Sequence, residues 1–186
     1  MRFYKVLNNQ VFNLGVFSIV PIREKDRFDI MNWRNEQIYH LRQDKPLDIE
    51  SQNNYFKNVI STLFIENEPN QILFSFLKND KCIGYGGLVH INWVDKNSEI
   101  SFIMDTKLEK QSFQIYWNTF LSLIEKIGFE ELKMHKLYVY AFDLRPHLYN
   151  VLEKSNYFKD AVLNQHCLFK NKYLDVVIYS KINSKN

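Results

Sequence analysis

The chain has 186 residues, a length that fits one domain spanning residues 1–186, with a core that needs neither disulfides nor metals. Apolar residues make up 46% of it and aromatic residues 16%, which indicates a well-packed globular protein and excludes a disordered one. The net charge of +3 is spread thinly, without a dense run of Lys or Arg, so we expect no nucleic-acid partner and no membrane partner.

The first third of the chain is predicted to hold one strand followed by two helices. A short apolar run ended by Pro21 predicts the strand, within residues 16–24. Helical spacing then predicts one helix within residues 26–35 and another within 47–64, for which Asp48 is the expected N-cap. The core-facing side chains of these helices are expected to be Phe28, Met31, Trp33, Ile49, Phe56, Val59, Ile60 and Leu63.

From residue 72 the apolar period changes to two, which predicts an antiparallel meander. Its three strands are expected at residues 72–78, 82–91 and 98–104. The segment GYGG at 84–87 lies inside this strand pattern, so it predicts a bulge or a close backbone approach and not a phosphate loop.

A long helix near residues 112–131 is predicted next, with a stripe of apolar residues at helical spacing. A strand at 136–142, a short helix at 145–155 with Pro146 in its first turn, and a closing hairpin complete the chain. The stripe of the long helix consists of Phe113, Trp117, Phe120, Ile124 and Ile127. Strands and helices mix along one chain, which predicts an α/β (α+β) fold.

The two cysteines, Cys82 and Cys167, lie in apolar strand patterns without metal-ligand spacing, and we expect buried, reduced thiols. No segment approaches the ~18 apolar residues of a membrane span, and the first ten residues lack the apolar stretch of a signal peptide. These features predict a cytoplasmic protein.

Segments 84–105, 128–142 and 149–181, in this order of elements, resemble the GNAT family of acyl-CoA-dependent N-acetyltransferases, and the resemblance extends over residues 16–181. The segment NWRN at 32–35 is most similar to the branch that acetylates nucleotide-linked amino sugars in pseudaminic-type glycan biosynthesis. Ribosomal-protein N-terminal acetylases and polyamine acetylases are similar in pattern. The resemblance implies a GNAT fold, a mixed but mostly antiparallel sheet of about seven strands flanked by about four helices.

The family places the acyl donor between its fourth and fifth strands, here residues 98–104 and 136–142, which splay apart. The resemblance implies that backbone groups near Ile103 and Met104 pair with the pantetheine arm of acetyl-CoA. A backbone N–H there is expected to stabilise the thioester oxyanion. The diphosphate is expected at the N-terminus of the long helix.

The family's diphosphate motif, Q/R-x-x-G-x-G/A, falls on residues 112–117, where its first residue and both glycines are replaced. Residues expected to contact the diphosphate are Ser112, Gln114, Ile115, Tyr116 and Trp117. In one interpretation, helix N–H groups still bind phosphate while the bulky side chains pack into the core. In the other, Ile115 and Trp117 crowd the site and the donor is lost or different. A helix start at Thr106, with Glu109 completing a capping box, would move the site upstream.

Acetyl transfer to an amine needs a route for the amine proton and an acid for the leaving thiolate. Glu99 is the expected general base, through water, unless it is only a solvated strand-end carboxylate. His90 is expected to share the task, with a structural role as the alternative. The family's tyrosine acid aligns with Leu152 and its helix-start Asn with Arg145, so Tyr149, one turn before Leu152, is the candidate acid. The alternative is that Tyr149 packs and solvent protonates the thiolate.

Trp33, Arg34 and Asn35 fall where the family forms its acceptor pockets. Arg34 is expected to bind an acceptor phosphate bidentately or to form a salt bridge within the fold. The histidines are too scattered to predict a metal site.

We therefore expect an acetyl-CoA-dependent N-acetyltransferase that acts on a small amine by direct attack, with a nucleotide-activated amino sugar as favoured acceptor. No Cys or Ser lies beside a base in a nucleophile motif, so we expect no covalent acyl-enzyme intermediate. The alternatives are an inactive GNAT-fold binding module, or an acyltransferase that uses another donor or a protein N-terminal amine. A monomer or homodimer is expected.

Overall fold

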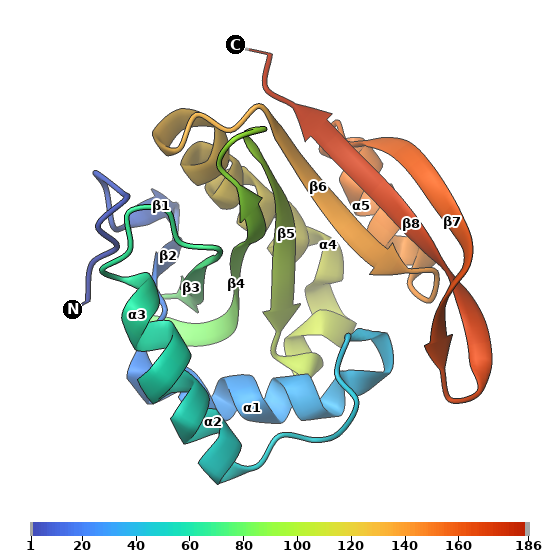
Figure 1. The fold of residues 1–186 in the computed structure, drawn as a ribbon, viewed down its shortest axis with the longest axis horizontal. Helices are drawn as coiled ribbons and strands as arrows, with labels where there is room; N and C mark the ends of the chain where they lie inside the picture. Colours follow the sequence, from blue (N-terminus) through green and yellow to red (C-terminus); the bar gives the residue numbers. More distant parts are fainter. Residues whose placement is uncertain (1, 185–186) are drawn as a thin grey trace.

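One twisted sheet of eight strands runs through the protein in the order β1-β2-β3-β4-β5-β6-β8-β7 (Figure 1). The structure is a computed structural model and describes residues 2–184. The strands are β1 (Phe12–Leu14), β2 (Phe17–Pro21), β3 (Ile72–Lys78), β4 (Lys81–Asn92), β5 (Asn97–Met104), β6 (Lys136–Phe142), β7 (Phe158–Phe169) and β8 (Lys172–Ile182). The helices are α1 (Arg27–Glu36), α2 (Ile49–Tyr55), α3 (Ser61–Leu63), α4 (Thr106–Glu125) and α5 (Pro146–Lys154).

Strands β5 and β6 pair in parallel, and the other neighbouring strands pair antiparallel. The predicted mixed, mostly antiparallel sheet is confirmed, with one strand more than expected. The extra strand is β1, which forms a hairpin with β2 around Gly15, whose φ of +59° suits glycine. Three residues are too few for an alternating pattern to show in the sequence.

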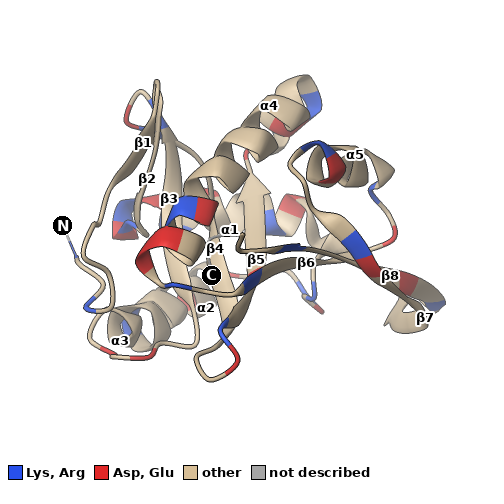
Figure 2. Ribbon diagram, turned by 90° about the horizontal axis from the view of Figure 1, so that it is seen from above, with Lys and Arg blue, Asp and Glu red and all other residues tan. Residues whose placement is uncertain are grey.

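The helices cover both faces of the sheet, with α4 and α5 on one face and α1 and α2 on the other (Figures 1 and 2). Successive side chains of each strand point to opposite faces of the sheet and therefore pack against opposite helix layers. Phe102 of β5 stacks on Phe120 of α4 with ring centroids 4.0 Å apart, whereas the preceding residue, Ser101, faces a cavity beneath α1 and α2. Phe76 meets the same pair of rings edge-on. These aromatic side chains form the centre of the core, as their spacing predicts.

The expected close backbone approach at GYGG is confirmed at Gly86. A Cβ atom at this position would lie 2.2 Å from the carbonyl oxygen of Ser101 and 2.9 Å from the ring of Phe120. Glycine is therefore required for β4 to pack between β5 and α4.

The helix from α2 to α3 is continuous through a π-helical turn at residues 56–60. Asp48 caps it as predicted, because its side chain accepts a hydrogen bond from the Ser51 N–H at 2.7 Å. The prediction that Ile49 and Val59 face the core is wrong, since both are exposed. Ile49 lies in the first turn of α2 and Val59 in the π-helical turn, and the side of the helix that is buried there carries Phe56 and Ile60.

The long helix begins six residues earlier than the main prediction. Asp105 caps α4 by accepting a hydrogen bond from the Lys107 N–H at 2.8 Å, so the helix starts at Thr106. The upstream start is confirmed, but the N-cap is Asp105 and not Thr106. At Ser112, φ −147° and ψ 38° break the helical path, and the helix resumes at Phe113.

Charged side chains of both signs are interspersed over the described elements (Figure 2). Cys82 is buried as expected, while Cys167 is half-buried, because it lies in β7, the edge strand, whose side chains are exposed or half-buried. No helix within residues 2–184 combines the length and the apolar character that crossing a membrane would require.

Candidate functional site

A gap opens in the sheet between β5 and β6. The two strands pair only where Asn97–Glu99 meet Lys136–Tyr138. Beyond this point β6 stays paired with β8 along its whole length, while β5 stays paired with β4. The two halves of the sheet twist away from each other, and the predicted splay of these strands is confirmed (Figure 1).

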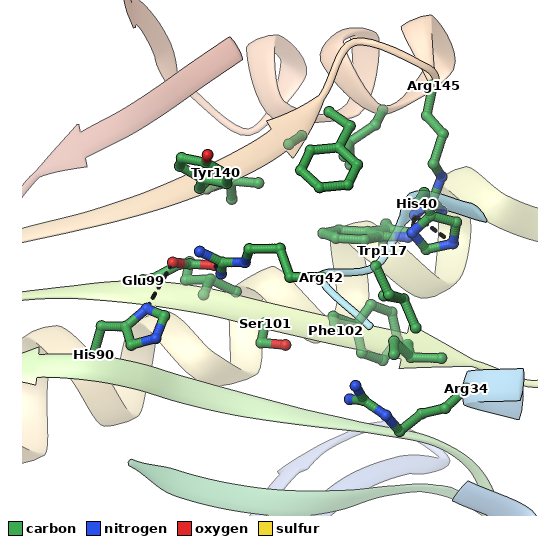
Figure 3. A pocket seen from close by; sticks show the side chains of 17 residues that line it. Arg34, His40, Arg42, His90, Glu99, Ser101, Phe102, Trp117, Tyr140 and Arg145 are labelled. Atoms are coloured by element: carbon green, nitrogen blue, oxygen red, sulfur yellow. Dashed lines mark hydrogen bonds and ion pairs between the residues drawn. The ribbon is translucent and has the colours of Figure 1, made fainter. Parts of the chain in front are cut away.

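A cavity of about 430 Å³ occupies this gap, a size typical of small-molecule sites. Figure 3 shows its side chains converging from both strands and from the start of α5. Glu99 lies at the narrow end, and Trp117 and Arg145 lie at the wide end. Its charged lining consists of three arginines and one carboxylate, namely Arg34, Arg42, Arg145 and Glu99.

The edge of β5 that faces the gap has free backbone groups. Asp105 donates its N–H to Ile83 of β4, and alternate residues of an antiparallel strand point to the same side. The backbone groups of Met104 and Phe102 therefore face the gap, and those of Ile103 face β4. The Met104 carbonyl already accepts a hydrogen bond from Gln37 Nε2 at 2.7 Å. Phe102, which the sequence analysis did not single out, thus has backbone groups that face the gap and can pair with an added strand.

Glu99, His90 and Arg42 form a connected cluster at the narrow end (Figure 3). The Glu99 side chain is 6% exposed, and its two oxygens contact Arg42 Nη2 at 2.5 Å and His90 Nδ1 at 2.9 Å. A β-bulge between Val89 and Asn92 and a left-handed backbone at His90, with φ +50°, bring its ring beside Glu99. The structure therefore brings together the two residues that the sequence analysis selected for proton transfer.

Arg145 lies at the opposite, wide end. It precedes Pro146 at the start of α5, and its guanidinium contacts Glu109 Oε1 at 2.6 Å. Its Nη1 lies 3.3 Å from a ring nitrogen of His40. Burial and the nearby Arg145 cation lower the pKa of His40 to about 3, so His40 is neutral at pH 7.

The positions that replace the diphosphate glycines differ from each other. Trp117 is buried and packs edge-on against Phe102, with centroids 5.0 Å apart, so it lines the wide end without filling the gap. Ile115 is 60% exposed and points away from the core. Tyr116 is buried against Phe17 on the far side of α4, outside the cavity lining. Ser112 is half-buried where the helix resumes, and Gln114 is exposed.

A second cavity, of about 250 Å³, lies between the sheet and helices α1 and α2, and Arg34 and Ser101 line both cavities. Arg34 donates hydrogen bonds to the Tyr85 hydroxyl at 2.6 Å and to Gln43 Oε1 at 2.9 Å. Within the described part of the chain it forms no ion pair with a carboxylate. Of the three expected acceptor residues, Arg34 alone faces a cavity.

Trp33 and Asn35 have other surroundings. Trp33 is buried in the core cluster. The Asn35 side chain accepts the Leu47 N–H at 2.7 Å and donates to the Leu47 carbonyl at 2.8 Å, which fastens the loop before α2. Neither residue lines the two cavities, and their contact with an acceptor stays a prediction.

Tyr149 and Cys82 lie outside the cavity lining. The Tyr149 hydroxyl donates to Asp143 Oδ1 at 2.8 Å, and its ring stacks on Tyr179. Burial and the hydrogen bond to Asp143 raise the pKa of Tyr149 far above its usual value. Burial likewise raises the pKa of the Cys82 thiol to about 12. In residues 2–184, no three His, Cys, Asp or Glu side chains are grouped closely enough to hold a metal ion.

A sequence profile of the acetyltransferase (GNAT) domain matches residues 19–178, which include both diverging strands and both ends of the cavity. The chain belongs to the GNAT acetyltransferase family. It is an acetyltransferase, and acetyl-CoA is its acyl donor. The open edge of β5 and the cavity in the gap fit the pantetheine arm of this donor, which such an edge can bind like an added strand.

Solved structures of GNAT enzymes share the fold. A spermidine N-acetyltransferase from Vibrio cholerae, in complex with CoA and spermine, has a TM-score of 0.78 at 16% identity and covers 92% of this chain and 98% of its own. A dodecameric form of a spermidine N-acetyltransferase from the same organism, in an intermediate state, has a TM-score of 0.75 at 18% identity, covering 92% and 96%. At such identities the similarity shows the fold alone.

Sequence reasoning did not single out Arg42, His40, Phe102 and Tyr85, which line the two cavities, and it did not predict the contacts of Arg145. Arg42 and His40 lie in an irregular segment after α1, where no periodicity indicates direction. Arg145 carried a usable signal, because a charged residue immediately before a helix-starting proline replaces the family's Asn.

Proposed function

We propose that this GNAT acetyltransferase transfers the acetyl group to a primary amine of a small acceptor by direct attack, with Glu99 as general base. The observation that supports this most is the buried Glu99 carboxylate at the narrow end of the cavity, oriented by Arg42 and His90. In the reaction, the amine nitrogen forms a bond to the thioester carbonyl carbon and the carbon–sulfur bond breaks. The amine proton passes through water to Glu99, and the thiolate takes a proton from solvent or from an acid.

The groups that support the remaining steps lie on β5 and α5. A backbone N–H on the open edge of β5 near Phe102 is proposed as the oxyanion donor, in place of the expected Ile103, whose backbone groups face β4. Because the Tyr149 hydroxyl is bonded to Asp143 outside the cavity, solvent is the simpler proton source for the thiolate. The predicted role of Tyr149 as the general acid is tested with a Tyr149→Phe variant.

Direct attack without an acyl-enzyme is supported by the position of Cys82. Its thiol is buried, contacts the Gly84 carbonyl at 3.3 Å, and is protonated at neutral pH because burial raises its pKa to about 12. A Cys82→Ala variant is expected to keep wild-type activity if it folds. Loss of activity with an intact fold would contradict direct attack.

For the acceptor we propose a nucleotide-activated amino sugar. Arg34 supports an anionic acceptor, because it lines both cavities and forms no ion pair with a carboxylate among the described residues, whereas Arg42 and Arg145 are paired with Glu99 and Glu109. Arg34 stands where the two cavities meet, so a phosphate bound bidentately there would leave the amine near Glu99 and the nucleoside under α1 and α2. A polyamine would bring several positive charges into this environment, which disfavours it.

Two measurements test the proposed function. In a thermal-shift titration, a ligand at 100 times its dissociation constant stabilises the fold by about 2.7 kcal/mol, so acetyl-CoA is expected to raise the Tm. Release of free thiol is then compared between UDP-linked amino sugars, spermidine and a peptide with a free N-terminus. No shift at millimolar acetyl-CoA would favour a binding module. A shift with another acyl donor alone would favour a different acyltransferase, and faster turnover of spermidine would overturn the acceptor assignment.

The proposed quaternary state is a monomer or homodimer. Light scattering coupled to size exclusion gives the mass of the assembly directly, and a dodecamer, as in the Vibrio cholerae structure, would contradict it.

A further inference from the structure

Arg145 is a buried cation whose hydrogen-bonding capacity is only partly used. Its side chain is 7% exposed, yet it lines the wide end of the cavity, where Figure 3 shows it reaching toward His40 and Trp117. The Nη2 group donates to Glu109, and the Nη1 group meets a neutral histidine. The buried Nε–H has no partner among the described residues. A guanidinium offers five donors in a planar fork, so this one can still bind an anion.

The same place holds the new start of a helix. The break at Ser112 interrupts the helical path, so a second helix N-terminus begins at Phe113 inside α4, and N–H groups at a helix start are the ones available to an anion. The Arg145 guanidinium lies over the ring of Phe113 at 5.1 Å and that of Trp117 at 5.9 Å, which are in the first turns after the break. A helix start and an unsaturated cation both attract phosphate, and here they adjoin each other.

Glu109 is the anion that Arg145 holds in this arrangement. It belongs to the turn of α4 that precedes the break, and its side chain is 12% exposed. A diphosphate carries more negative charge than one carboxylate and accepts bidentate hydrogen bonds, so it can compete with Glu109 for the guanidinium. Ile115 does not prevent this, since it points to solvent.

We propose that Arg145, with the helix start after Ser112, binds the diphosphate of the acyl donor in place of the missing glycine-rich loop, and that Glu109 competes with the diphosphate for Arg145. This inference rests on the proposed function, and it makes Arg145 a donor-binding residue whose side chain, at the N-cap of α5, takes the place of the missing glycines.

Calorimetric titration of purified protein with CoA, dephospho-CoA and pantetheine separates the contributions. Dephospho-CoA keeps the diphosphate but lacks the 3′-phosphate, and pantetheine lacks both. Arg145→Gln is expected to weaken CoA and dephospho-CoA by about 10- to 100-fold, the loss of a charged hydrogen bond, and to leave pantetheine within about twofold. Arg145→Lys is expected to recover part of this loss, because it keeps the charge without the fork. Equal weakening of all three ligands, or none, would overturn the proposal.

Glu109→Gln is a second test, in which the affinity for CoA is expected to change in the opposite direction. This test remains available if Arg145→Gln fails to fold. Removing the competing carboxylate is expected to tighten CoA several-fold, because the Arg145 guanidinium is then free to bind the diphosphate, with pantetheine unchanged. Weaker or unchanged CoA binding would show that Glu109 only supports the fold. It would contradict the proposal that Glu109 competes with the diphosphate for Arg145. Asp95→Asn is the matched control, because it removes an exposed carboxylate from the loop between β4 and β5 and changes the net charge equally. If wild-type protein binds neither CoA nor pantetheine, the proposed function fails, whereas binding that ignores Arg145 refutes this inference alone.

Discussion

Replacing Glu99 by Gln is expected to remove the general base without disturbing the site that holds it. Gln is nearly isosteric, so its Oε1 can still accept the hydrogen bond that Arg42 now donates at 2.5 Å. The Arg42 side chain is 46% exposed, so losing the charge of this pair is expected to cost about 1 kcal/mol of folding free energy or less. The Tm and near-ultraviolet circular dichroism should therefore stay close to wild type.

The kinetic effect is expected to be large and to depend on pH. Loss of a positioned general base costs about 10²- to 10⁴-fold in kcat. An amine with a pKa of about 10.4, that of lysine, is neutral in roughly one molecule in 2,500 at pH 7 and about one in ten at pH 9.4. The Glu99→Gln rate should therefore rise close to tenfold per pH unit over this range, and the ratio to wild type should narrow.

Release of free CoA thiol, followed at saturating acetyl-CoA with each acceptor, measures this effect. Asp95→Asn is the matched control, because it removes an exposed carboxylate from the adjoining loop and changes the net charge equally. Wild-type turnover by Glu99→Gln at pH 7, or a ratio that stays constant to pH 9.4, would refute Glu99 as the base. His90→Ala is expected to have a smaller effect, because it removes one of two groups that orient Glu99.

Three further predictions concern the fold and the proton source. His40 keeps a pKa of about 3 in the folded state against 6.5 when unfolded, mainly because it is buried, so the unfolded chain binds its proton first and stability falls as the pH drops from 6.5. Between pH 6.5 and 4.5 wild type should lose about 2 to 3 kcal/mol more than His40→Asn in urea unfolding, and parallel curves would contradict this. Gly86→Ala should destabilise the protein by about 1 to 3 kcal/mol, because its Cβ meets the Ser101 carbonyl at 2.2 Å, and an unchanged urea midpoint would show that β4 can move. Tyr149→Phe should leave kcat within about twofold, whereas a loss of 10²-fold or more would restore Tyr149 as the acid.

Periodicity was sufficient to predict the elements that bury one apolar stripe or alternate regularly. The predicted stripe of the long helix is buried at Trp117, Phe120 and Ile124 of α4 and at Ile127 in the π-helical turn that follows, and the meander of β3, β4 and β5 has the expected order. Local chemistry also predicted the Asp48 cap and the close approach at Gly86. Periodicity failed for β1, which is too short to show alternation, and for the first turn of α2, which no partner covers.

The arrangement of the site residues could not be predicted from periodicity. Glu99 and His90 were identified from their places at strand ends, but their 2.9 Å contact depends on a bulge and a left-handed residue that no pattern announces. Arg42, His40 and Arg145 reach the cavity from irregular segments or from a helix start, where direction is set by packing.

By itself, the sequence determined the family, the order of strands and helices, and the loss of the glycine motif, because these depend on residue types and spacings along the chain. Only the tertiary structure decided that Trp117 lines the gap without filling it, that the helix restarts after Ser112, and that Arg145 reaches this point from α5. Such facts depend on how segments far apart in the chain are oriented, and side-chain direction across a fold is fixed only when the packed layers meet.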